Sequence, residues 1–169
     1  MKKCLFLLLL FLLAGVTHSK EVRLFKDFGL DNPMSYQFVR TIAQDKDGFM
    51  WFGSHEGLHR FDGYQFLSYH HDASNENALS SDVISQILID SHQRLWVGTS
   101  GAGLNLFREQ SQDFLHVSAE TEGMSLTNNV INVLFEDSAG QLWIGTEQGL
   151  NILTFKDSQW QIKQITQQL

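Results

Sequence analysis

Four residues in one short stretch have side chains suited to binding a polar ligand. His55, Glu56, His59 and Arg60 lie in the sequence SHEGLHR. Imidazole, carboxylate and guanidinium groups together offer hydrogen-bond donors, hydrogen-bond acceptors and both charges. They could gather at a polar rim that binds a small molecule or a glycan. The same stretch is also typical of a surface loop without a ligand, and the sequence leaves both interpretations open.

The sequence contains histidines and aspartates that could bind a metal or act in catalysis. Their spacing favours neither a metal site nor a catalytic site. His70, His71 and Asp72 are consecutive, and neighbouring residues of a strand point to opposite faces. A zinc site needs three or four convergent ligands. The sequence has no Ser-His-Asp order, no Gly-rich phosphate loop and no paired-carboxylate spacing. We therefore predict no metal, no cofactor and no enzymatic activity for this chain.

The first 19 residues are predicted to form a secretory signal peptide. Two lysines precede an apolar run of 13 residues, Cys4 to Val16. A membrane-spanning helix needs about 20 apolar residues, so this run is short. Small residues precede the predicted cleavage site after Ser19. The alternative is an uncleaved signal sequence that anchors the protein in the membrane. We expect an exported, periplasmic protein.

Charge and cysteine content narrow the classes of partner. The formal net charge of the chain is −7, which argues against nucleic acid and anionic lipid as partners. The single cysteine, Cys4, lies in the predicted signal peptide. The mature protein would have no disulfides, so its stability must come from a packed core.

One phrase around a tryptophan occurs three times in the chain. The tryptophans are Trp51, Trp96 and Trp143, spaced 45 and 47 residues apart. Periods of this length are typical of propeller blades or of helical repeats. The third copy contains NNVINVLFED, AGQLWIGT, GLNILTF and QWQIKQI, four short apolar runs with alternating character. Such runs predict four strands, and repeated four-stranded antiparallel sheets predict an all-β propeller.

Turn chemistry recurs with the repeat. An aspartate begins the same turn in each copy: Asp45, Asp90 and Asp137. Its side chain can accept hydrogen bonds from backbone amides two residues on. Gly48 and Gly140 can then adopt the positive φ that closes the hairpin. The second copy has Gln93 at this place, which predicts a small strain or a slightly different turn in that blade.

Two further sets of glycines recur at fixed places. One set lies inside a strand, two residues after each tryptophan, where a neighbouring backbone or ring is expected to pack closely: Gly53, Gly98 and Gly145. The other set opens the third strand of each copy after a tight turn: Gly57, Gly103 and Gly149. We interpret these glycines, the tryptophans and the turn aspartates as structural, because they recur in every copy.

The pattern D-x-x-G-x-L-W-I-G-T-x-x-G-L-N resembles the two-component regulator propeller repeat. GQLWIGTEQGLNIL and LTNNVINVLFED carry the resemblance most fully, and GFMWFGSHEGLHRFDGYQF is similar to the first blade of such proteins. The resemblance implies seven-bladed propellers in the periplasmic part of bacterial sensors. Histidine kinase or diguanylate cyclase output domains follow, and the ligands are glycans in many cases. A full-length sensor of this kind is anchored in the inner membrane.

Residues 36–78, 79–124 and 125–169 are predicted to form blades one, two and three. Within residues 20–35, the stretch Glu21 to Phe28 is predicted to be a strand that completes the last blade of the ring. A propeller needs about four to eight blades to close. We therefore expect an incomplete ring whose remaining blades come from a longer chain or from self-association.

Three functions fit these observations. The leading hypothesis is an extracytoplasmic ligand-sensing module of a two-component or cyclic-di-GMP sensor, without its output domain. The second is a secreted glycan-binding or scaffold propeller. The third is a quinone-dependent propeller enzyme, although the Gly-x-x-Trp spacing at Gly48 and Gly140 is shorter than the spacing in those enzymes.

Overall fold

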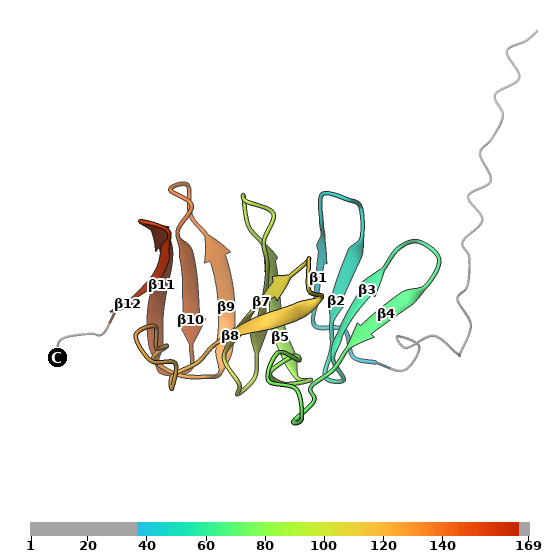
Figure 1. Cartoon of the computed structure of the whole chain (residues 1–169), viewed down its shortest axis with the longest axis horizontal. Coiled ribbons are helices and arrows are strands. Elements are labelled where there is room, and N and C mark those ends of the chain that lie inside the picture. Colours follow the sequence, from blue (N-terminus) through green and yellow to red (C-terminus); the bar gives the residue numbers. More distant parts are fainter. Residues whose placement is uncertain (1–36, 166–169) are drawn as a thin grey trace, which may run out of the picture.

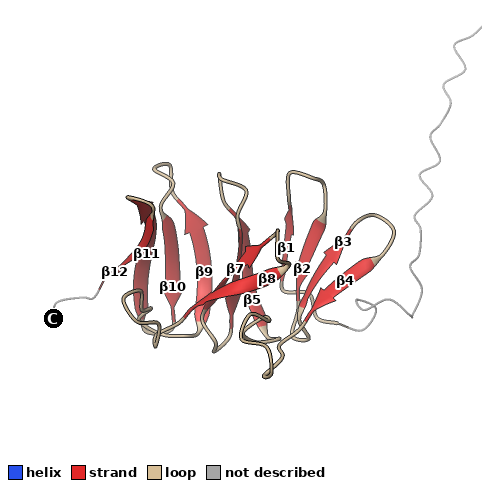
Figure 2. Cartoon of the chain, viewed as in Figure 1, coloured by secondary structure: helices blue, strands red, loops and turns tan. Residues whose placement is uncertain are grey.

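A computed structural model describes residues 37–165 as three antiparallel sheets of four strands each. The described part contains strands, turns and loops but no helix, so none of its elements is a helix that could cross a membrane. Figure 1 shows the three sheets side by side, and Figure 2 shows that all regular elements are strands. The predicted all-β fold with four-stranded antiparallel blades is confirmed.

Each sheet is a meander in which sequential strands pair. Blade 1 consists of β1 (Thr41–Gln44), β2 (Met50–Gly53), β3 (Leu58–Phe61) and β4 (Phe66–Tyr69). Blade 2 consists of β5 (Ile84–Ile89), β6 (Leu95–Thr99), β7 (Leu104–Arg108) and β8 (Asp113–Val117). Blade 3 consists of β9 (Ile131–Glu136), β10 (Leu142–Thr146), β11 (Gly149–Lys156) and β12 (Gln159–Ile165).

The blades stack face to face along their first strands, because β5 contacts both β1 and β9. The hairpins that join the first two strands of each blade lie at one end of the molecule, at the top of Figure 1. The connections between blades lie at the opposite end. We call the tryptophan-bearing face of each blade its back, and the other face its front.

Two apolar cores fill the spaces between the blades. The first core joins the back of blade 1 to the front of blade 2 and includes Trp51, Leu58, Ile84, Ile87, Leu95, Val97 and Phe114. The second core joins the back of blade 2 to the front of blade 3 and includes Trp96, Leu104, Ile131, Leu134, Leu142, Ile144 and Leu153. Successive residues of a strand point to opposite faces, so the strands of blade 2 contribute apolar side chains to both cores.

The turn aspartate and the tryptophan of each blade form one hydrogen-bonded unit. The indole Nε1 donates to the aspartate Oδ2 at 2.7 Å for Trp51, 2.8 Å for Trp96 and 2.7 Å for Trp143. The other carboxylate oxygen accepts two backbone amides, including the amide two residues on, as predicted. The carboxylate thereby closes the turn and satisfies the polar end of the tryptophan ring, which packs between sheets in blades 1 and 2.

The second blade carries the backbone strain that its sequence predicts. Gln93 has a φ of 64°, in the same left-handed region as Gly48 at 88° and Gly140 at 75°. A side chain at such a φ is unfavourable. The backbone hydrogen bond from Gln93 to the Asp90 carbonyl, at 2.8 Å, keeps the turn closed nonetheless.

The glycines within the second strands make the close approaches expected of them, but the neighbour differs from the prediction. An ideal Cβ on Gly53 would lie 2.5 Å from Cγ2 of Ile84, and one on Gly98 would lie 2.6 Å from Cγ2 of Ile131. The neighbour is thus an isoleucine of the next blade, and not a backbone or a ring. On Gly145 the nearest atom is Cγ1 of Val133, which belongs to the same blade.

The glycines that open the third strands follow tight turns, as predicted. Their φ values are 124°, 80° and 142° for Gly57, Gly103 and Gly149. In each blade a hydroxyl group three or four residues earlier donates a hydrogen bond to the glycine carbonyl. The donors are Ser54, Thr99 and Thr146, at 3.2, 2.8 and 3.0 Å. The predicted signal peptide and the predicted strand within residues 20–35 lie outside the described residues. The number of blades in the full ring stays a prediction.

Candidate functional site

The four residues predicted to form a polar rim occupy three different environments. His55 and Glu56 are exposed in the β2–β3 turn. His59 lies on β3 and has no exposed surface. Arg60, the next residue of β3, is on the back of blade 1, because it pairs across the sheet with Trp51. The structure therefore brings only His55 and Glu56 together at the surface.

Three residues just before β1 contact His55 and Glu56. Gln37 Nε2 donates to Glu56 Oε2 at 3.2 Å, and Arg40 Nη1 lies 3.5 Å from His55 Nε2. The rings of Phe38 and His55 have centroids 5.8 Å apart. We call these five residues the turn-end cluster.

The turn-end cluster combines an exposed ring with charged groups. Phe38 is 70% exposed, so its ring face is open to a ligand. Arg40 and Glu56 supply opposite charges, and His55 can donate or accept a hydrogen bond. An apolar ring face beside such groups can stack on one face of a sugar ring while the polar groups bind its hydroxyls. The cluster lies at the inner strand of blade 1, beside the line along which the three blades meet.

Sequence reasoning missed Gln37, Phe38 and Arg40 because they precede the strand and belong to no repeated motif. A signal was nevertheless present. The second and third blades have small aliphatic residues where Phe38 stands, Val83 and Val130. A large ring at a position that is aliphatic in the other copies marks a departure from the repeat.

His59 has an architectural role, and its burial corrects the expected place at the rim. Its Nδ1 lies 2.8 Å from Ser68 Oγ, and its Nε2 lies 3.4 Å from Ser54 Oγ. Burial, and secondly the nearby His70, lower the pKa of His59 to about 4, although Asp82 acts in the opposite direction. His59 is therefore neutral at physiological pH, and its two ring nitrogens are held by hydroxyl groups from the adjoining turn and strand.

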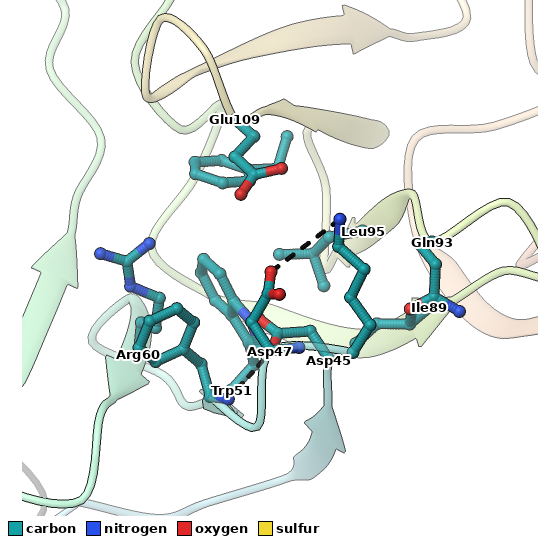
Figure 3. Close-up of a pocket in the computed structure, with 11 residues that line it drawn as sticks. Asp45, Asp47, Trp51, Arg60, Ile89, Gln93, Leu95 and Glu109 are labelled. Atoms are coloured by element: carbon teal, nitrogen blue, oxygen red, sulfur yellow. Dashed lines mark hydrogen bonds and ion pairs between the residues drawn. The ribbon is translucent and has the colours of Figure 1, made fainter.

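Arg60 lies in a different place, a small pocket between blades 1 and 2. Its guanidinium carbon is 4.8 Å from the centroid of the Phe49 ring and 5.7 Å from that of Trp51. Figure 3 shows Arg60 near the aspartate turn of blade 1, with Glu109 of blade 2 across the pocket. The cavity is about 50 Å³. This is room for ordered water and far below the roughly 300 Å³ of a typical ligand pocket.

The two adjacent histidines after β4 make separate contacts. His70 Nδ1 lies 3.6 Å from Asp82 Oδ1, whereas His71 Nδ1 lies 3.0 Å from the Leu79 carbonyl. Across residues 37–165, no group of three or more His, Cys, Asp or Glu side chains is arranged to hold a metal ion.

Comparison with known proteins places the repeats in a family. The family model of the two component regulator propeller matches the chain three times, at residues 33–56, 78–101 and 125–148. A histidine kinase P4 of Formosa agariphila is 36% identical over 56 residues, which are 33% of this chain and 4% of that protein.

Solved structures share the fold. The extracellular domain of a protein described as a hybrid two component system from B. thetaiotaomicron is 27% identical with a TM-score of 0.70, over 80% of this chain and 19% of that one. PorZ, a surface component of the type-IX secretion system of Porphyromonas gingivalis, is 26% identical with a TM-score of 0.53, over 66% of this chain and 17% of PorZ. Virginiamycin B lyase from Staphylococcus aureus, 20% identical with a TM-score of 0.58 over 85% of this chain and 45% of the lyase, shows the fold alone.

The chain spans 4% of the curated relative and less than a fifth of the first two structures. The three family matches cover the aspartate turn, the tryptophan strand and the strand before them in every blade. The similar hybrid-system domain has the same fold over four fifths of the chain. The chain therefore contains three copies of the two component regulator propeller repeat.

Proposed function

We propose that this chain is the ligand-sensing propeller part of an exported bacterial sensor that acts through a two-component or cyclic-di-GMP output. One observation carries the proposal. The extracellular domain described as part of a hybrid two component system has the same fold over 80% of the chain, at 27% identity. The predicted signal peptide agrees with a periplasmic location. The proposal gives the chain a binding role rather than a catalytic one.

The turn-end cluster is the proposed contact with the ligand. Its exposed ring, Phe38, and its charged groups suit a glycan or another small polar molecule, and an acidic chain does not suit nucleic acid. Its place beside the inner strands is where turns from successive blades converge in a propeller. Ligand bound there would contact several blades at once.

The binding experiment is a glycan microarray followed by calorimetric titration of the best ligand. A variant carrying Phe38→Ala, Arg40→Ala and His55→Ala should lose at least about tenfold in affinity, equivalent to 1.4 kcal/mol. The matched control replaces Lys46 and Asp47 with alanine, because both are exposed in the β1–β2 hairpin at the opposite end of blade 1. Equal affinity of the triple variant and the unaltered chain would place the ligand elsewhere. Absence of any ligand would contradict the binding role.

A secreted binding or scaffold propeller is the second candidate, and the similarity to PorZ favours it. The two candidates differ in their cellular effect. Deletion of the gene from its own bacterium should abolish transcription induced by the ligand if the protein is a sensor. A scaffold would leave that response intact and would alter the cell surface instead.

A further inference from the structure

The loop that joins blade 1 to blade 2 forms a pocket that shares no residue with the turn-end cluster. The loop comprises residues 70–83 and lies at the end of the molecule where the blades are joined (Figure 1). The pocket has a volume of about 310 Å³, which lies within the roughly 300–1,000 Å³ of small-molecule sites. We call it the connection pocket, and its lining includes His71, Asp72, Glu76, Leu79, Ser80 and His116.

Hydrogen bonds hold the loop in place, so the connection pocket is formed before a ligand arrives. The backbone amides of Asn75 and Ala78 donate to the carbonyls three residues earlier, each at 3.0 Å, which closes two successive turns. The Asn77 carbonyl accepts the Phe114 amide at 2.9 Å, and this bond attaches the loop to β8. A preformed site binds a ligand without the entropic cost of ordering a loop.

Two histidines of the connection pocket are oriented by backbone carbonyls. Nδ1 of His71 lies 3.0 Å from the Leu79 carbonyl, and Nε2 of His116 lies 2.7 Å from the Ala78 carbonyl. A carbonyl oxygen only accepts, so these two nitrogens carry the protons. The other nitrogen of each neutral ring is therefore an acceptor, and neither makes a hydrogen bond within residues 37–165. The two rings leave two acceptors for a ligand.

The loop between blades 2 and 3 has the same anchor as the first loop but lacks the first histidine. In the first loop the His71 amide donates to Asp82 Oδ1 at 2.7 Å. In the next loop the Ala119 amide donates to Asn129 Oδ1, also at 2.7 Å. Asp82 and Asn129 each lie eight residues before the turn aspartate of their blade. An alanine suffices at this place, so the anchor does not require the imidazole of His71.

The second histidine is also replaced in the next blade. Gln164 holds the place of His116, because each pairs across the sheet with the asparagine of the third strand. Nε2 of Gln164 donates to the Ser125 carbonyl at 3.1 Å, as Nε2 of His116 donates to a carbonyl of its own loop. A flexible amide group therefore suffices to hold a loop, and the fold does not require a rigid imidazole here. Both histidines are departures from the repeat.

Two carboxylates give the connection pocket a negative charge. Asp72 Oδ1 accepts the hydroxyl and the amide of Ser74, at 2.6 and 2.8 Å, and these hydrogen bonds lower the pKa of Asp72. Glu76 is exposed and makes no hydrogen bond or ion pair within residues 37–165. No lysine or arginine lines the pocket, and Leu79, which is 1% exposed, adds apolar surface beside the charges. The pocket therefore favours a cationic ligand with a carbon chain.

We propose that the connection pocket binds a small aliphatic diamine. Its two ammonium groups match the two carboxylates in number and in sign, and their protons are donors for the free nitrogens of His71 and His116. Its carbon chain can lie on the apolar surface of Leu79. A metal ion does not fit, because no three His, Asp or Glu side chains among the described residues are placed to coordinate one. The proposal depends neither on the turn-end cluster nor on the sensor role.

The test is calorimetric titration of the chain with 1,4-diaminobutane at low ionic strength, because salt screens exposed charges. Binding is expected. The uncharged 1,4-butanediol, which has the same carbon chain, should bind at least about tenfold more weakly, and butylamine should lie between the two. Nuclear magnetic resonance should place the shifted amide signals in residues 71–80 and at His116.

Asp72→Asn combined with Glu76→Gln should weaken diamine binding at least about tenfold, because both charges are lost. An asparagine side chain can still accept the Ser74 hydrogen bonds, so the turn should persist, which far-ultraviolet circular dichroism checks. His71→Ala should weaken binding by about threefold, because one acceptor is lost. Its fold should be intact, since the next loop carries alanine at this place.

The matched control combines Glu122→Gln with Glu147→Gln, which changes the net charge equally at two exposed carboxylates outside the pocket. Its affinity for the diamine should equal that of the unaltered chain. An equal loss in the control would show that the diamine responds only to the overall charge, and would overturn the proposal. Absence of diamine binding, equal binding of butanediol, or full affinity after loss of both pocket carboxylates would overturn it as well.

Discussion

The Cγ2 atom of Ile131 lies 2.6 Å from the position that a Cβ of residue 98 would occupy, so the interface between blades 2 and 3 depends on Gly98 having no side chain. The Cβ of Ile131 is also close, at 3.0 Å from the same position. Rotation of the isoleucine side chain therefore cannot relieve the contact. The close packing of Ile131 on Gly98 therefore determines how near blades 2 and 3 lie to each other.

Gly98→Ala should lower the free energy of unfolding by about 2–3 kcal/mol, because overpacking forces backbone shifts at the interface. Gly145→Ala provides the comparison. Its new Cβ would meet only Cγ1 of Val133 closely, at 2.5 Å, and that side chain is half exposed and can rotate. We expect a loss below about 1 kcal/mol there. Urea denaturation measures the free energy of unfolding of both variants. Equal losses would contradict the role given to Ile131 at the interface.

Asp90→Ala should be among the most destabilising single substitutions. Asp90 is 3% exposed and accepts hydrogen bonds from the indole of Trp96, from Arg94 Nε and from the backbone amides of His92 and Arg94. Loss of the carboxylate leaves a buried indole N–H without its acceptor, at a cost of about 2–4 kcal/mol including the turn. Thermal denaturation measures the effect.

The control for that substitution is Asp62→Ala. Asp62 accepts only backbone amides, from Tyr64 and Gln65, in an exposed turn. Its replacement should cost less than about 1 kcal/mol. A loss as large as that of Asp90→Ala would show that the turn sets the cost, and not the buried indole with the Arg94 ion pair.

Gln93→Gly should stabilise the protein by about 0.5–1 kcal/mol. The substitution relieves the strain of a side chain at a φ of 64°, a cost of about 1–2 kcal/mol, while glycine adds some entropy to the unfolded chain. The reverse change in blade 3, Gly140→Gln, should destabilise by a similar amount. Urea denaturation midpoints of the two variants should therefore move in opposite directions.

His59 should make stability depend on pH between about 6.5 and 4. Its pKa is lowered to about 4 in the folded protein, so the unfolded chain takes up a proton first as the pH falls. The free energy of unfolding therefore falls through this window, by up to about 3 kcal/mol, and is unaffected by His59 above it. Denaturation at pH 7.5 and pH 5 measures the difference.

His59→Asn is the matched variant, because Asn105 and Asn151 hold this register in blades 2 and 3. It should remove most of the difference between the two pH values. Carboxylates with lowered pKa values, such as Asp113 beside Arg108 and Asp137 beside Trp143, stabilise the folded protein when ionised. Their protonation at low pH lowers the free energy of unfolding of the parent and of the variant alike. Only the difference between variant and parent therefore reports on His59. If the variant keeps the pH dependence of the parent, His59 is not the group that causes it.

Local chemistry made much of the fold predictable. The alternation of apolar residues within each short run fixed the strands and their two faces, and the turn from Asp137 to Gly140 followed from side-chain and backbone hydrogen bonds within a few residues. The strain at Gln93 could be predicted for the same reason, because a backbone conformation needed at a repeated turn does not depend on distant residues.

The candidate site depended on contacts between segments far apart in sequence. His59 and Arg60 are adjacent in the chain, yet the alternation of the strand places His59 on the front of blade 1 and Arg60 on its back, toward blade 2. Gln37 and Glu56 meet only because β1 pairs with β2 and β2 turns into β3. The sequence by itself determined the repeated strands, turns and glycines, because these obey rules of short range. Only the tertiary structure decided which side chains are exposed together, because burial depends on the neighbouring blade.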